Sequence, residues 1–284
     1  MLCFSELSMT SNEHTRPTGA NPRNARRRAL CIQALLWALL VPSPAACALS
    51  IAAQAPQIKA GAEELQIIQK LEALGARIFK DEERVVEVKL DRTQTGDEDL
   101  KLVGALPHVT DLSLEQTQVG DNGMSYLKAI PKLEWLNLFG TQIGDNGLRA
   151  LKEISSLQHL PIGHTKVTDA GVIHLKSMPQ LLYLGLRGNA VSDSGVRHLQ
   201  ALKNLLGLHL GETGITDEGV QYLQGLTRLQ KLWLHNTQIS DKAIAFLTNL
   251  KELKELYVYE TRISSEGIKR LQAALPDCRI VSRQ

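Results

Sequence analysis

Ten side chains suited to contacting a partner recur in this sequence at one fixed spacing. They are aromatic rings, imidazoles and one guanidinium, and each stands in register with other members of the set on a 24-residue period. The ten are Trp135, Phe139, His159, Tyr183, Arg187, His209, Trp233, His235, Tyr257 and Tyr259. Trp, Tyr and Arg contribute most of the binding energy at protein interfaces. The set therefore predicts a surface for recognition.

Other kinds of chemistry find little support in the sequence. There is no nucleophile elbow, no glycine-rich phosphate loop and no His-Glu-x-x-His pattern, so we expect neither an enzyme nor a bound cofactor. A metal site needs ligands that converge on one ion. The spacing predicts roughly 8 Å between the Cβ atoms of His209 and His235, which argues against a shared ion. We therefore expect no metal.

The fixed spacing comes from a 24-residue unit that recurs along most of the chain. Around Leu112 and Leu114 apolar residues alternate with a period of two, which indicates a short strand. Met124, Leu127 and Ile130 follow three apart, which places them on one face of a helix. One such unit cannot bury its apolar side alone, so the units must stack into a solenoid. The leucines that mark the register are Leu112, Leu136, Leu160, Leu184, Leu208, Leu232 and Leu256.

We predict an α/β fold, a leucine-rich-repeat solenoid or horseshoe of eight repeats. A parallel β-sheet is expected on its concave face and short helices on its convex face. The repeats begin at Val85, Val109, Leu133, Leu157, Leu181, Leu205, Leu229 and Leu253. In each strand the leucines point inward, so positions 111, 113, 115 and 116 and their equivalents in the other repeats face the concave side. These columns hold all ten candidates, and also His164, Glu212, Lys231 and Glu255.

Part of the repeat matches a known pattern. The stretches "TQIGDNGLRAL", "TKVTDAGVIHL" and "TGITDEGVQYL" resemble the T-D-x-G-L type of leucine-rich repeat, as in bacterial secreted proteins. The resemblance covers about residues 85 to 281 and implies the fold, but no particular ligand. The pattern is also similar to the cysteine-containing subclass in F-box substrate adaptors. Thr occupies the usual Cys column here and we recognise no F-box segment ahead of the repeats, which counts against that function.

Polar residues repeat with the same period, and we expect each column to satisfy backbone groups. A column of Thr, with Asn189 in one slot, predicts a ladder of hydroxyls beside the turn. An Asp just before each helix, such as Asp169, is expected to cap the helix N-terminus, which explains the column without calcium. A Gly two residues later, such as Gly195, indicates a close approach between neighbouring turns that leaves no room for a Cβ atom.

Pro161 stands in the middle of the strand predicted for the fourth repeat. Proline has no N–H group, so one hydrogen bond of the sheet must be lost there. We therefore expect a local kink or bulge, at a cost of about 1 kcal/mol.

Residues 1–60 follow none of these patterns. Residues 1–48 hold a basic region, a short apolar core and the small-residue site Ala46-Cys47-Ala48, which predict a secretory signal peptide with a long front. Residues 49–60 are then a linker. Two alternatives also keep the repeats outside the cytoplasm: a lipid attached at Cys47, or residues 29–53 retained as a membrane anchor. A reading frame that starts too early would instead leave the protein in the cytosol.

The repeat array needs a cap at each end, because a stack of repeats leaves an apolar face open there. We expect residues 61–84 to form an N-terminal cap helix and turn. The apolar face of the helix would carry residues three apart, joined by two others: Leu65, Ile68, Leu71 and Leu74, with Ile67 and Ile78. The array itself is expected to span residues 85–276. Residues 277–284 would add a half-repeat as the C-terminal cap, in which Cys278 is a small buried apolar residue.

Charge narrows the function further. The formal net charge is +2, and the predicted leader holds five Arg against two Glu, so the rest of the chain is nearly neutral. That balance gives no reason to expect nucleic-acid binding. We therefore predict an exported, non-catalytic scaffold, secreted or periplasmic, whose concave sheet recognises a protein or a glycan. The alternatives are a structural or membrane-anchored envelope protein, an intracellular F-box-like adaptor, and aromatic residues that only pack on one another.

Overall fold

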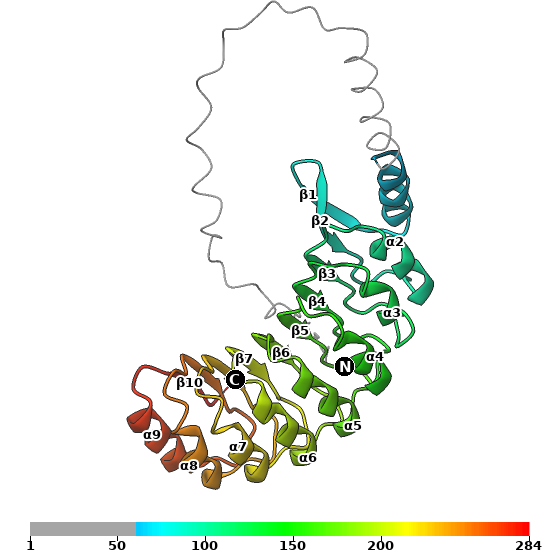
Figure 1. Ribbon diagram of the computed structural model, residues 1–284. Coiled ribbons are helices and arrows are strands. Elements are labelled where there is room, and N and C mark those ends of the chain that lie inside the picture. The colour runs from blue at the N-terminus through cyan, green and yellow to red at the C-terminus, as the bar shows by residue number, and fades with distance from the viewer. Residues whose placement is uncertain (1–60, 284) are drawn as a thin grey trace, which may run out of the picture. The chain divides into compact units, whose positions relative to one another are not determined.

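The computed structural model describes residues 61–283, which lie within one compact unit of the chain. Within these residues ten strands form one sheet, in the order of the sequence from β1 to β10 (Figure 1). The first two strands form an antiparallel hairpin, and all later neighbours are parallel. The strands are β1 (Arg77–Asp81), β2 (Arg84–Lys89), β3 (Asp111–Ser113), β4 (Trp135–Asn137), β5 (His159–Pro161), β6 (Tyr183–Gly185), β7 (Gly207–His209), β8 (Lys231–Trp233), β9 (Glu255–Tyr257) and β10 (Arg279–Val281).

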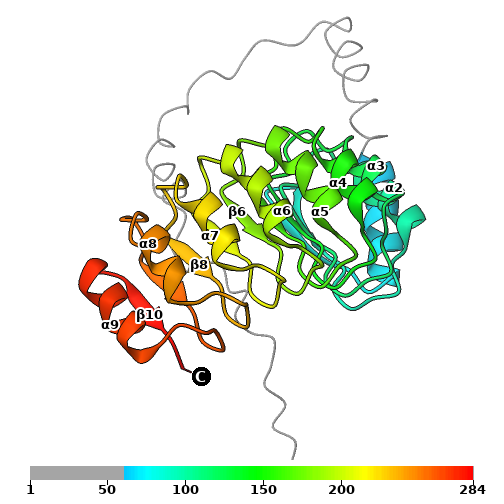
Figure 2. The ribbon, with the colours of Figure 1, turned by 90° about the horizontal axis from the view of Figure 1, so that it is seen from below.

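Short helices connect the parallel strands and lie in a row on one side of the sheet (Figure 2). They are α2 (Leu100–Gly104), α3 (Met124–Leu127), α4 (Asp145–Leu151), α5 (Asp169–Val172), α6 (Asp193–Val196), α7 (Asp217–Leu223), α8 (Ile244–Leu247) and α9 (Ser265–Ala274). The 3-10 helices Asp97–Asp99 and Asp241–Ala243 precede α2 and α8, and Ile173–Ser177 and Arg197–Ala201 follow α5 and α6. This alternation confirms the predicted leucine-rich-repeat solenoid.

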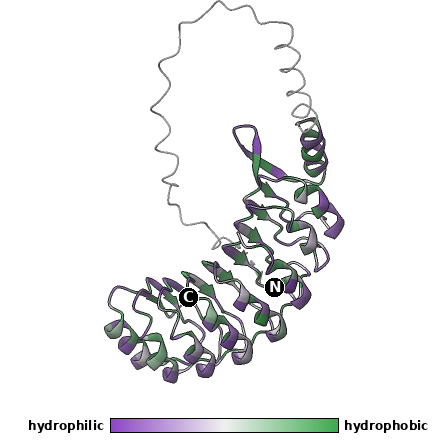
Figure 3. Cartoon of the chain, viewed as in Figure 1, coloured by the Kyte–Doolittle hydropathy of each residue, from purple (hydrophilic) through white to green (hydrophobic). Residues whose placement is uncertain are grey.

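The 24-residue register is kept from strand to strand. Leu112 pairs with Leu136, and Leu208 with Leu232, so equivalent residues of successive repeats lie side by side. Each register leucine is fully buried, and hydrophobic and hydrophilic residues alternate along the repeats (Figure 3). Burying a leucine side chain stabilises a fold by about 1.5–3 kcal/mol. The core is therefore a continuous column of aliphatic side chains between sheet and helices.

The N-terminal end of the repeat stack differs from the prediction. Residues 61–73 are helical, and Ile68 and Leu71 are buried against the first repeat. Ile78, however, lies in β1 and not on the helix, and Leu65 is 53% exposed, so those two parts of the prediction are wrong. Gly75 takes a left-handed φ of 93°, a conformation that ends helices and that glycine adopts without a steric penalty. The chain then turns into the β1–β2 hairpin.

The C-terminal end carries β10, which pairs in parallel with β9. Cys278 is buried beside it, and burial raises the pKa of its thiol to about 11. The signal peptide and linker predicted for residues 1–48 and 49–60, with their alternatives, lie outside the described residues. Within residues 61–283, no helix combines the length and the apolar character needed to cross a bilayer.

The aspartate column joins neighbouring repeats and does not cap helices, so that prediction is wrong. Where a side chain caps the helix, it comes from the preceding Ser or Thr: Ser192 accepts the N–H of Ser194. The carboxylate of Asp169 instead accepts two bonds from the next repeat, from Ser192 N (2.8 Å) and Ser192 Oγ (2.5 Å). Asp145, Asp193, Asp217 and Asp241 make the same pair of bonds, and Asp97 and Asp121 make the backbone bond to a glycine.

The glycine column fits against these aspartates. A Cβ atom on Gly195 would overlap Oδ1 of Asp169 and lie 3.1 Å from its Cγ, which confirms the predicted lack of room. Repeat seven has Ala243 in this column, and there the helix begins as a 3-10 helix. The repeats are therefore held together at the turn by a carboxylate that occupies the space a side chain would need.

In the described repeats the threonine hydroxyls of this column donate within their own repeat, and only that of Thr165 also reaches the next repeat, at Asn189 Oδ1 (3.3 Å). The hydroxyl of Thr213, for example, donates to the carbonyl of Leu210 in its own turn. Only the prediction that these hydroxyls satisfy the backbone is confirmed. Asn189 does reach across, because its side-chain nitrogen donates to Ile162 O and its oxygen accepts Thr165 N.

Pro161 weakens the sheet on one side only. β5 pairs with β4 through Trp135 and His159 alone, while all three of its residues pair with β6. The predicted loss of pairing is thus confirmed. The 24-residue register is kept on both sides, so the proline interrupts the pairing and leaves the register unchanged.

Candidate binding face on the concave sheet

All ten candidate residues lie in β4 to β9 or two residues beyond a strand end, on the side of the sheet opposite the buried leucines. Eight are half-buried. His209 and His235 are buried, with 6% and 3% of their surface exposed. Neither Trp135 nor Trp233 turns into the hydrophobic interior.

Trp233 stands between two other rings. His209 stacks on one face with the ring centroids 5.3 Å apart and the planes 7° from parallel. Tyr257 stacks on the other face at 5.5 Å and 12°. The three residues are register partners on β7, β8 and β9. Stacking therefore follows directly from the repeat, and it leaves the edges of the three rings toward the concave side.

Three further rings join this stack. His235 stacks on Tyr259 at 4.5 Å and meets His209 edge to face at 5.2 Å. Tyr183 lies 6.3 Å from Trp233 with the planes 82° apart. Six of the ten candidates thus form one group, which we call the ring cluster. Its members are Tyr183, His209, Trp233, His235, Tyr257 and Tyr259.

Glycines beneath the rings make this packing fit. A Cβ atom on Gly207 would lie 2.8 Å from Cδ2 of Tyr183, and one on Gly211 would lie 2.6 Å from Nε2 of His235. The two rings therefore rest on the backbone of the sixth repeat. Burial of Tyr183 raises the pKa of its hydroxyl to about 12.

An ionic group flanks the ring cluster. Arg187 donates to Oε1 of Glu212 from Nε (2.8 Å) and from a terminal nitrogen (2.5 Å), and His164 Nε2 lies 3.4 Å from Oε2. We call these three residues the charged triad. Burial opposes ionisation of Glu212, but the hydrogen bond and charge of Arg187 outweigh it and lower the pKa of the carboxyl. Burial, and then Arg187, lower the pKa of His235, against the opposing charge of Glu212.

Two members of the charged triad sit at strained backbone positions. One residue in every repeat, just beyond the strand, has a φ between 50° and 69°. For residues other than glycine this left-handed conformation costs roughly 1–2 kcal/mol. Only two of the eight positions carry glycine, while His164 and Glu212 occupy others. The eight are Arg92, Gln116, Gly140, His164, Gly188, Glu212, Asn236 and Glu260.

The remaining candidates extend the face toward the N-terminus. Phe139 meets His164 edge to face at 5.0 Å, and Trp135 pairs with His159 across β4 and β5. Four strand spacings separate Trp135 from Trp233, a distance of about 19 Å. The structure therefore brings six candidates into the ring cluster and places Trp135, Phe139 and His159 at a distance along the same face.

The candidate list missed several residues that belong to this face. His164 and Glu212 complete the charged triad, and Lys231 pairs with Glu255 at 2.7 Å, beside the Tyr257 hydroxyl that donates to Glu255. All four stand in columns predicted to face outward. The sequence could have indicated them, because residues of opposite charge stand one or two repeats apart in these columns. A search for aromatic rings alone does not find that pattern.

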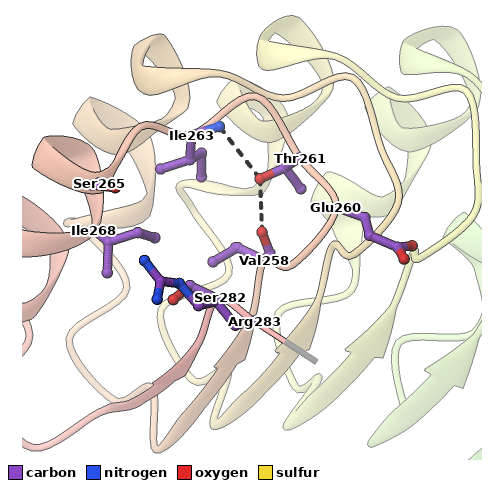
Figure 4. Close-up of a pocket in the computed structure, with 8 residues that line it drawn as sticks. All are labelled: Val258, Glu260, Thr261, Ile263, Ser265, Ile268, Ser282 and Arg283. Atoms are coloured by element: carbon purple, nitrogen blue, oxygen red, sulfur yellow. Dashed lines mark hydrogen bonds between the residues drawn. The ribbon is translucent and has the colours of Figure 1, made fainter.

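Neither a metal site nor a deep pocket coincides with the ring cluster. In the part of the chain that the structure describes, no group of three or more His, Cys, Asp or Glu side chains is placed to hold a metal ion. A pocket of about 330 Å³ lies at the C-terminal end of the stack, where Thr261 donates to Val258 O (Figure 4). Ser265 lines it, in the column that carries the inter-repeat aspartate elsewhere. Recognition at the ring cluster would therefore use an open surface.

Comparison with known proteins supports the architecture. Residues 105–128, 129–152 and 201–223 match the family model described as Leucine Rich repeat. The chain folds as a leucine-rich-repeat solenoid. It is similar to internalin C2 (inlC2) of Listeria monocytogenes, with 25% identity and a TM-score of 0.59 over 70% of this chain and 81% of that one.

Two other solved structures are also similar to parts of this chain. An internalin (inlF) of Listeria monocytogenes is 24% identical with a TM-score of 0.58, and the match covers 69% of this leucine-rich-repeat chain but only 53% of the internalin. A plant peptide hormone receptor, RGFR1 in complex with RGF2, is 20% identical over 66% of this chain and 30% of its own, with a TM-score of 0.46. Curated protein sequences gave no match.

Proposed function

We propose that this protein is an exported, non-catalytic binding scaffold whose concave sheet recognises another protein. The observation that carries the proposal is the ring cluster. The aliphatic core beneath the sheet is closed without these rings, so they are not needed to fill it. Half-buried Trp and Tyr on an open sheet face supply the type of area that dominates binding energy at protein interfaces.

The arrangement of the rings favours a protein over a glycan. A sugar ring packs on an open aromatic face, and both faces of Trp233 are covered by His209 and Tyr257. The edges of aromatic rings carry partial positive charge. They attract carbonyl oxygens, which a polypeptide presents at every residue. A glycan ligand is therefore the second candidate.

Self-packing of the rings accounts for part of the arrangement only. It explains why His209 and His235 are buried. It does not account for the charged triad beside the rings. A polar rim around an apolar patch is typical of protein interfaces, which supports a binding role for the triad.

Export, the domain boundaries and the T-D-x-G-L repeat type are parts of the same proposal. The alternatives are an envelope protein held by its N-terminus and an intracellular adaptor like the F-box class. A reporter fused after residue 60 separates them. A released reporter supports export, a membrane-bound or lipidated one supports the envelope protein, and a cytosolic one with an intact leader supports the adaptor.

Display of random peptides on phage tests the binding face directly. Peptides selected on the immobilised full chain should no longer bind a Trp233→Ala/Tyr257→Ala variant. They should still bind the control Tyr126→Ala, which removes a partly buried ring from the convex helix α3. Circular dichroism checks the fold of each variant. Peptides that bind the double variant equally well would rule out this face, and selection of sugars on a glycan array instead would favour the second candidate.

A further inference from the structure

Three histidines, one arginine and one glutamate lie in a continuous group at the edge of the ring cluster. His209 meets His235 at 5.2 Å between ring centroids. His164 and Arg187 both contact Glu212, and Arg187 and Glu212 both act on the charge of His235. Histidine changes charge between about pH 5 and 8. A fall in pH over this range would therefore add positive charge in direct contact with the rings.

The hydrogen bond of His209 requires a neutral ring. Its Nδ1 accepts the backbone N–H of Gly211 at 3.2 Å, and only an unprotonated nitrogen can accept such a bond. Trp233 covers one face of the ring, and the edge contact with His235 lies beside it. A proton on Nδ1 would set two donors against each other, and the imidazole would have to leave its stack.

A proton on His235 would add a positive charge beside the positive charge of Arg187. Tyr259 covers one face, the backbone of Gly211 lies beneath it, and His209 meets it on the neighbouring strand. Arg187 repels a proton there, Glu212 attracts one, and burial disfavours the charged form. Glu212 is already engaged by Arg187 and His164. On the other side of Trp233, Lys231 forms an ion pair with Glu255, and Glu255 also accepts the hydroxyl of Tyr257.

We propose that the ring cluster is a pH gate: it stays assembled while His209 and His235 are neutral and opens when either takes up a proton. The gate lies on the face that the proposed function uses. One consequence of the gate, the release of a ligand, rests on that proposed function. A ligand bound at neutral pH is released in mild acid, because the stacked Trp233–Tyr257 surface is lost.

The chain itself supplies a variant that separates protonation from structure. At the position equivalent to His209 three repeats earlier, Asn137 accepts the N–H of Phe139 through Oδ1 at 3.0 Å. His209→Asn should therefore keep the backbone hydrogen bond, while it removes the titratable group together with the ring that stacks on Trp233. His235→Asn removes the second one. His198→Asn, on the convex 3-10 helix Arg197–Ala201, is the matched control.

Fluorescence of Trp233 tests the gate without any ligand. In the full chain carrying Trp37→Phe and Trp135→Phe, emission should change between about pH 7 and pH 5 while the far-ultraviolet circular dichroism stays constant. The transition should survive His198→Asn and disappear in the His209→Asn/His235→Asn variant. Emission that is flat over this range, or a transition that persists in the double variant, would overturn the gate.

Peptides selected on the full chain then test the consequence. Their affinity should be at least about tenfold weaker at pH 5.5 than at pH 7.5, the equivalent of about one pKa unit. In the double variant the ratio of the two affinities should fall to about one, whatever its affinity at pH 7.5. Equal affinity of the unmutated chain at the two pH values would overturn release. Failure to select any peptide would remove the proposed function, while the fluorescence result would still decide the gate.

Discussion

A Cβ atom has no place at Gly195, because the carboxylate of Asp169 from the preceding repeat occupies the space. That carboxylate cannot withdraw cheaply, since it accepts both the N–H and the hydroxyl of Ser192. Single residues in this fold thus act through the repeat next to them. The same holds on the concave side, where glycines of one strand receive the rings of another.

Gly195→Ala should lower the free energy of unfolding by about 1–3 kcal/mol, the usual cost of overpacking. Urea denaturation measures it. Gly214→Ala is the control, because a Cβ atom there would meet only Val191 O at 3.5 Å. If the two substitutions lower the free energy of unfolding equally, the carboxylate of Asp169 does not limit the space at Gly195.

Acid should destabilise the fold through His235. Burial and Arg187 lower its pKa in the folded chain, so the unfolded chain binds a proton first, near its ordinary pKa of about 6.5. The stability is fully present above that value and is lost as the pH falls toward the folded pKa. Urea midpoints at pH 7.5 and 5.5 should differ more for the unmutated chain than for His235→Asn. An equal difference would show that His235 does not contribute.

At the scale of elements, each helix start from α3 to α9 is bonded to the previous repeat through aspartate. Strand, turn and helix are individually too short to be stable, and nearest-neighbour contacts supply the missing energy. The aspartate bonds join units at the turn, and the register leucines join them in the core. Pro161 shows that the sheet tolerates a local loss of pairing when these other contacts continue.

Removing one aspartate of the column should weaken a single interface between repeats. Asp193→Ala leaves Thr216 N and Thr216 Oγ1 without their acceptor, at an expected cost of about 1–3 kcal/mol. Glu252→Ala, an exposed carboxylate, is the control and should change little. The readout is the urea midpoint, and indistinguishable midpoints for the two variants would contradict the role of the column.

At the scale of the molecule, stability depends on closing the ends of the repeat stack. The helix of residues 61–73 covers the first repeat with Ile68 and Leu71. Because each repeat contacts only its neighbours, damage at one end should spread inward gradually. The C-terminal end carries Ser265 where the other repeats carry aspartate, so the bonding column stops with the last helix.

Leu71→Ala should expose the first repeat and cost about 2–5 kcal/mol. Hydrogen exchange should then speed up in repeats one and two before it does so in repeats seven and eight. Leu65→Ala on the same helix is the control, since Leu65 is 53% exposed. Uniform loss of protection along the whole array would mean that the repeats unfold as one unit.

The 24-residue spacing by itself determined the solenoid, its strands and the columns that face the concave side. This was possible because residues one repeat apart in sequence lie one strand spacing apart, about 4.8 Å, in space. The period alone therefore places Trp233 beside His209 and Tyr257, and it also predicted the crowding at Gly195.

Only the tertiary structure decided what each side chain touches within its column. Asp169 points toward the next repeat, His235 is buried over Gly211, and His164 and Arg187 meet at Glu212. These contacts depend on the size and shape of neighbours in adjacent repeats. Ile78 in the β1–β2 hairpin was missed because the periodic signal ends there. A repeat specifies which positions are neighbours, whereas side-chain packing selects the contacts among them.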